Sequence, residues 1–187
     1  MAGDAGAIHV SASAGSLIAV EGVHADSLVS AARALAQKRT STGALSFWDA
    51  SGIFAELAVT DEGAGPPSAR TLLLLYASDL AYRLRSEVLP ALALGHDVVV
   101  APYVETPLAF ARVANVNSEW IADIFAFAPK PDVRYYAAAQ PGGLSERQGF
   151  VEFAGRKLLA GRDIERFIRE TDRHLRGFAR LTGGLRL

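Results

Sequence analysis

Cysteine is missing from the 187-residue chain. Its absence excludes disulfide bonds, thiolate metal sites and cysteine nucleophiles, and it is typical of proteins in a reducing compartment. An excess of charge of one sign is missing as well, because the formal net charge is −1. A nearly neutral chain has no global basic field that would gather nucleic acid or anionic lipid.

Long hydrophobic runs are also absent. The apolar run at residues 72–75 is far too short to span a bilayer. The first basic residue is Arg33, so the N-terminus lacks the charged start of a signal peptide. We therefore expect a cytoplasmic protein that has no membrane partner and no specific nucleic-acid partner.

What is present is the composition of a soluble globular protein, with 50% hydrophobic and 21% charged residues. Residues 1–15 are mostly small and have no strong hydrophobic period, which predicts a flexible N-terminal lead. Residues 16–182 form a single predicted domain in which strand and helix patterns alternate. Strands are predicted at 16–20, 44–48, 97–100 and 133–137, and helices at 26–38, 71–94, 106–127 and from 163 to about 181. This alternation predicts an α/β domain, with helices on both faces of a parallel sheet.

The predicted helix from Thr71 to Leu94 is apolar nearly all round in its first turns. A helix in a small domain normally keeps one polar face. Two apolar faces indicate that one packs on the sheet and the other on a partner, so we expect a homodimer through this helix. The alternative is that other helices of the same chain cover the second face.

The segment from Leu17 to Leu35 has the order of a nucleotide-binding site: an apolar strand, a glycine, a turn and an amphipathic helix. Further motifs follow it along the chain, namely Pro90-Ala91-Leu92, Gly95, Val98-Val99-Val100, Tyr103, Leu108-Ala109-Phe110 and the stretch KPDVRYYAAA at 130–139. In this order and spacing, they resemble the thymidylate kinase family over most of the chain.

The resemblance implies a three-layer α/β/α fold of the P-loop kinase type, with a mostly parallel five-stranded sheet. It also implies a homodimer, and the transfer of a phosphoryl group from ATP to dTMP with Mg²⁺.

The residues that would hold the phosphates depart from the family pattern. Gly22 is retained, whereas the loop carboxylate is replaced by His24, the lysine by Leu28 and the first hydroxyl by Val29; Ser30 remains at the next position. A phosphate loop needs a lysine for the β- and γ-phosphates and a hydroxyl for Mg²⁺. These five positions therefore indicate a degenerate phosphate loop.

The acceptor side departs too. The family's Asp-Arg-Tyr motif reads Ala101-Pro102-Tyr103, and the arginine after the long helix's aromatic-x-Ala-Asp pattern is Leu80. A vestigial nucleoside pocket could still be formed by Tyr76, Asp79, Tyr103 and Phe110, although aromatic residues on apolar helices usually pack in a core or an interface. The segment that would form the lid, residues 142–156, contains two arginines, at 147 and 156, but no tight cluster.

Phosphoryl transfer depends mostly on charge neutralisation and positioning, so these losses favour a catalytically inactive protein. We assign it no catalytic residue, no metal ligand and no cofactor, and expect it to act as a dimeric scaffold or regulator, through a nucleoside-like ligand or a protein partner. One alternative is an active nucleoside monophosphate kinase that uses ATP and Mg²⁺ with cations from elsewhere, for example Arg83, Arg85, Arg112 or Arg147. Another is a purely structural interaction module.

Overall fold

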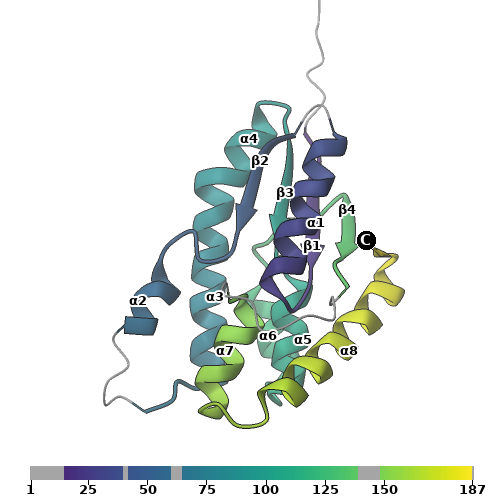
Figure 1. Cartoon of the computed structure of the whole chain (residues 1–187). Helices are drawn as coiled ribbons and strands as arrows, with labels where there is room; N and C mark the ends of the chain where they lie inside the picture. Colours follow the sequence, from purple (N-terminus) through teal and green to yellow (C-terminus); the bar gives the residue numbers. More distant parts are fainter. Residues whose placement is uncertain (1–14, 40–41, 60–64, 139–147, 187) are drawn as a thin grey trace, which may run out of the picture.

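The computed structural model describes residues 15–39, 42–59, 65–138 and 148–186 (Figure 1). The predicted flexible lead falls almost wholly on residues 1–14, which lie outside the described residues. No helix within these ranges is both long and apolar enough to cross a bilayer.

A parallel sheet forms the middle layer, in the order β2-β3-β1-β4-β5. Its strands are β1 (Leu17–Glu21), β2 (Thr42–Phe47), β3 (Asp97–Ala101), β4 (Val133–Tyr136) and β5 (Leu185–Arg186). The predicted parallel sheet is confirmed, but in the described part of the chain only four strands are longer than two residues. The fifth, β5, is a two-residue edge pairing with β4.

The two central strands, β1 and β3, are buried along their whole length. Their sequences are nearly uninterrupted apolar runs, as expected for strands of a parallel sheet that is covered on both faces. Ile18 lies opposite Val99 in the register that joins the two strands. This pairing fixes where the carboxyl ends of both strands meet.

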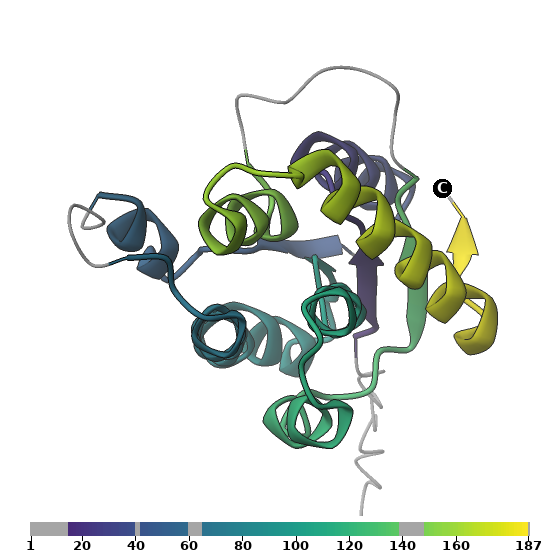
Figure 2. The same cartoon turned by 90° about the horizontal axis from the view of Figure 1, so that it is seen from below.

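Helices cover both faces of the sheet (Figure 2). On one face, α1 (Ala25–Lys38) packs Leu28, Ala32 and Leu35 against Ile18 and Val99. On the other lie α3 (Ala69–Arg83), η1 (Leu84–Val88), α4 (Leu89–Ala93) and α5 (Glu105–Val113). The predicted three-layer α/β/α architecture is therefore confirmed.

The predicted long helix is continuous through α3, η1 and α4, and it ends before Gly95, whose φ is +80°. Its middle segment, η1, is a π-helical turn. Pro90 follows two residues later and lacks the N–H that a regular helix would use. A local widening of the helix next to that proline accommodates the missing bond.

The single helix predicted at 106–127 is wrong. The structure has α5, which ends at Val113, and a separate α6 (Ser118–Ile124). Asn115 adopts a left-handed conformation with φ of +55°, and the Asn117 side chain accepts a hydrogen bond from the Trp120 amide at 2.8 Å. An asparagine in that conformation followed by an asparagine N-cap ends one helix and begins the next.

Three more helices complete the chain: α2 (Ile53–Val59), α7 (Phe150–Leu159) and α8 (Ile164–Thr182). The final helix α8 was predicted, whereas α2 and α7 were not. Figure 1 shows α7 and α8 beyond the carboxyl ends of β1 and β2. They cover the edge of the sheet at which an open α/β fold binds its ligands.

Candidate functional site

The candidate site lies where the chain leaves β1 and enters α1, through Gly22, Val23 and His24. The connection from β1 leads to β2 on one side of the sheet, whereas the connection from the neighbouring strand β3 leads to β4 on the other side, so the crossovers from these two strands run in opposite directions. In open α/β sheets such a switch point, at the carboxyl ends of the strands, is where ligands bind. The first turn of α1 presents its backbone amides to this place.

The carboxylate of Glu152, from α7, occupies this helix N-terminus. Its Oε1 lies 2.9 Å from Nδ1 of His24, and its Oε2 accepts a hydrogen bond from the Ala25 amide at 3.3 Å. The same Oε2 accepts a second bond, from the Gly149 amide at 2.8 Å. Only 2% of Glu152 is exposed, so this charge is held inside the protein.

One carboxylate therefore serves the N-termini of two helices, α1 and α7. The approach is close, because a Cβ on Gly149 would lie 3.2 Å from the Ala25 nitrogen. The amides at a helix N-terminus and the helix dipole together favour a bound anion. In this chain a side chain supplies that anion.

The remaining phosphate-loop residues hold no charge. The Gly22 amide donates to Oγ1 of Thr106 at 3.2 Å, so this loop donor already has a partner. Leu28 is 2% exposed and packs with the strands beneath α1, whereas Val29 lines a surface cavity and Ser30 is exposed. The lysine position thus contributes to the core, and the first hydroxyl position contributes an apolar wall.

Glu21, at the end of β1, was not predicted as a site residue. Its buried carboxylate accepts hydrogen bonds from the amides of Tyr103, Glu105 and Thr106 and from the Thr106 hydroxyl, at 2.6–3.1 Å. Burial raises the pKa of Glu21 despite these bonds. The contacts fasten the carboxyl end of β1 to the start of α5 and so fix the floor of the site.

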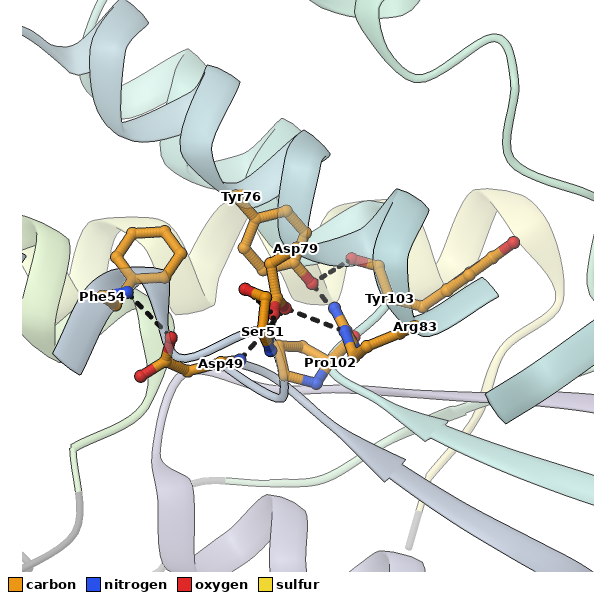
Figure 3. A network of polar contacts seen from close by, with 8 residues as sticks. All are labelled: Asp49, Ser51, Phe54, Tyr76, Asp79, Arg83, Pro102 and Tyr103. Carbon is orange, nitrogen blue, oxygen red and sulfur yellow. Dashed lines mark hydrogen bonds and ion pairs between the residues drawn. The ribbon is translucent and has the colours of Figure 1, made fainter. Parts of the chain in front are cut away.

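On the acceptor side, Asp79 organises the turn that follows β2 (Figure 3). Its Oδ2 accepts from the Asp49 amide at 3.0 Å, and its Oδ1 accepts from the amide and hydroxyl of Ser51 at 3.0 and 2.8 Å. Arg83 completes the group, with Nε 2.9 Å from Asp79 and Nη1 donating to the Pro102 carbonyl at 3.1 Å. Both charges are fully buried, so each neutralises the other rather than an exposed ligand.

The aromatic residues of the predicted nucleoside pocket lie inside the core. Tyr76, Tyr103 and Phe110 are each no more than 1% exposed. Phe150, from α7, packs among them, with ring centroids 4.4 Å from Tyr76 and 5.2 Å from Phe110. The two phenols bond to backbone carbonyls, Tyr76 to Tyr103 at 2.7 Å and Tyr103 to Pro129 at 2.8 Å. Phe150 therefore packs against two of the predicted residues, and the role of the predicted set toward a nucleoside stays a prediction.

Comparison with known proteins identifies relatives of part of the chain. No family model matches it. The probable thymidylate kinase 2 of Saccharolobus solfataricus is 34% identical over 97 residues, 50% of this chain and 44% of that protein. The probable thymidylate kinase of Staphylothermus marinus is 32% identical over 77 residues, 41% of this chain and 39% of that protein. The chain thus spans less than half the length of these curated relatives.

Among solved structures, thymidylate kinase from Ehrlichia chaffeensis aligns with a TM-score of 0.68 and 11% identity, over 92% of this chain and 85% of that one. The strand order, the three layers and this likeness define a fold of the P-loop kinase type. The sequence matches are more specific: about half of the chain is similar in sequence to probable thymidylate kinases.

The residues at the candidate site do not fit ATP and Mg²⁺. A buried carboxylate stands at the α1 N-terminus, and leucine and valine stand at the lysine and hydroxyl positions. Within the described ranges there is also no group of three or more histidine and carboxylate side chains that could hold a metal. A triphosphate placed here would meet a negative charge and no lysine.

The His24–Glu152 pair predicts a pH dependence of stability. The hydrogen bond to Glu152 raises the pKa of His24, and the carboxylates of Asp172 and Asp26 add to the effect. A base whose pKa is higher in the folded than in the unfolded protein stabilises the fold at pH values below its pKa in the unfolded state. That stabilisation is lost as the pH rises through its pKa in the folded state. His24→Gln should therefore lower the free energy of unfolding by about 1 kcal/mol near pH 6 and by clearly less near pH 9.

Urea unfolding of both proteins at the two pH values measures this difference. His174→Gln, at an exposed position of α8, is the matched control and should change little at either pH. A His24→Gln cost that does not shrink with rising pH would contradict the pairing.

Removal of the internal carboxylate should expose an anion site. Glu152→Ala is expected to lower the free energy of unfolding by about 1–3 kcal/mol, because two amides and His24 lose a buried partner. Inorganic phosphate should then raise the melting temperature of this variant more than that of the unaltered protein. Thermal unfolding with and without phosphate measures this difference in melting temperature. Glu119→Ala, at an exposed position of α6, is the control for general salt effects. Equal phosphate effects in all three proteins would refute an anion site beneath Glu152.

Proposed function

We propose that this thymidylate kinase-like protein does not transfer phosphoryl groups and acts instead by binding, as a dimeric scaffold or regulatory protein. The observation that carries the proposal is the Glu152 carboxylate at the N-terminus of α1. Binding a triphosphate there requires this buried carboxylate to move or to lie beside four negative phosphate charges. Loss of even one preorganised donor costs a phosphoryl- or acyl-transfer enzyme about 10²–10³ in rate.

Of the four arginines named for an active enzyme, two already contact other side chains of the chain. Arg83 is fully buried against Asp79, and the guanidinium of Arg112 lies 5.9 Å from the ring centre of Phe178. Arg85 is exposed on η1, and Arg147 lies outside the described residues. These placements support a protein that needs neither ATP nor Mg²⁺.

The second candidate function is an active nucleoside monophosphate kinase with a remodelled phosphate site. The names of the curated relatives, both called probable thymidylate kinases, favour it. It requires a conformation in which α7 withdraws Glu152 and another part of the chain supplies the missing cations.

The two functions differ in their response to ATP·Mg²⁺. Under the proposed function, calorimetric titration gives no saturable heat in the micromolar range, because an internal carboxylate already stands at the N-terminus of α1 and bonds its first amide. A coupled assay of ADP release, run over all ribo- and deoxynucleoside monophosphates, gives no turnover above buffer. Saturable micromolar binding accompanied by turnover would establish the kinase instead.

A homodimer through the long helix is supported by the side chains on its outer surface. Leu74, Tyr82 and Leu89 are 45–48% exposed along α3, η1 and α4. The opposite side of this helix, including Leu73 and Leu80, is buried in the core. Large apolar side chains that recur along one exposed helix form a surface suited to a second copy.

If the protein dimerises through this surface, charged substitutions on it should separate the two chains and halve the mass measured in solution. Sedimentation of the unaltered protein should give the mass of two chains at micromolar concentration. Leu74→Glu combined with Tyr82→Glu should give the mass of one, because two charges cannot be buried without partners. Leu181→Glu, at an 85% exposed position on α8, should leave the dimer intact. A monomer mass for the unaltered protein would exclude the dimer.

A further inference from the structure

A cavity of about 440 Å³ opens beside the degenerate phosphate loop. It lies between α1 and the turn that follows β2, and Leu28 and Val29 form part of its wall. These are the lysine and hydroxyl positions of the family pattern. The volume is within the range of small-molecule pockets, which runs from about 300 to 1,000 Å³.

One part of the wall of this cavity is apolar and partly aromatic. Phe47 and Trp48 line it from the end of β2 and the turn beyond. Trp48 is held in place by Phe54 and Phe153, whose ring centroids lie 5.0 and 5.9 Å from its own. A rigid aromatic wall favours a flat aromatic ligand, because ring contacts then form without ordering the side chain.

Three polar side chains line the rest of the cavity. Asp49 is already engaged, because its two carboxylate oxygens accept from the amides of Phe54 and Ala55 at 2.8 and 3.0 Å. Arg33 lies one helical turn beyond Val29, is exposed, and takes part in no ion pair among the residues that the structure describes. The Gln148 side chain is also exposed at the cavity. One guanidinium beside an apolar wall matches one anionic group on an apolar ligand.

We propose that this cavity binds a small aromatic monoanion, whose flat ring packs against Trp48 and Val29 and whose carboxylate pairs with Arg33. Such a ligand carries one negative charge, against the four of ATP, so a single arginine suffices. The inference rests on the proposed binding function, and it gives that function a ligand class.

The probe is 2-naphthoate, compared with the neutral 2-naphthamide, in calorimetric titrations of the full chain. The dissociation constant for naphthoate should be on the order of 10–100 μM, the affinity that a ligand of this size reaches with ordinary efficiency. Naphthamide should bind roughly tenfold more weakly, because it cannot pair with the guanidinium.

Two variants test where the probe binds. Val29→Trp fills the cavity and should abolish binding, and its melting temperature shows whether it has folded. Arg33→Gln, at an exposed position, should weaken naphthoate binding roughly tenfold and abolish the preference over naphthamide. Arg173→Gln, at an exposed position on α8, is the matched control and should change neither.

The outcomes separate this inference from the proposed function. No saturable naphthoate binding, or binding that Arg33→Gln leaves unchanged, overturns the ligand class, whatever the protein does with ATP. Turnover of ATP in the coupled assay overturns the proposed function, and the naphthoate titration then still reports on the cavity by itself.

Discussion

The contact between Glu152 and the first amide of α1 is the constraint on which the rest of the structure depends. Two helix N-termini, those of α1 and α7, converge on one buried carboxylate. This requires α7 to cross the carboxyl edge of the sheet, and it brings position 149 so close that a Cβ there would lie 3.2 Å from the Ala25 nitrogen. Once α7 is there, Phe150 enters the core between Tyr76 and Phe110. The same helix therefore supplies the anion at the phosphate position and the rings that fill the acceptor side.

Electrostatics links the two sides of the site. Each side retains buried charges, and each is neutralised within the chain: Glu152 by amides and His24, Asp79 by Arg83. In a phosphoryl-transfer enzyme, the cations and donors of the site are kept for substrate and transition state. In this chain the carboxylates of Glu152 and Asp79 have their partners within the protein itself. The cavity beside Val29 is open, and the residues at the lysine and hydroxyl positions of the family pattern form an apolar part of its wall.

Most of the fold could be predicted from the sequence, because strong hydrophobic patterns specify it. β1 and β3 are nearly uninterrupted apolar runs, and α8 follows a regular helical period.

The break between α5 and α6 was missed because Asn115 and Asn117 act through a left-handed turn and a cap, which interrupt no apolar pattern. Tyr76, Asp79 and Tyr103 were predicted as acceptor-side residues from the resemblance, but no local pattern shows that Phe150 packs beside Tyr76. Glu152 lies 128 residues from His24, and such a long-range pairing has no signal in a single sequence. The only local sign of a role for Glu152 was its place three positions after a glycine at a helix start, which is the spacing of a capping box.

The most direct test of the central claim is a crystal structure determined with ATP and Mg²⁺ at saturating concentration. The account predicts that Glu152 stays within hydrogen-bond distance of the Ala25 amide, with no ordered triphosphate over residues 22–30. An ordered triphosphate seated on those residues, with Glu152 displaced, would contradict it.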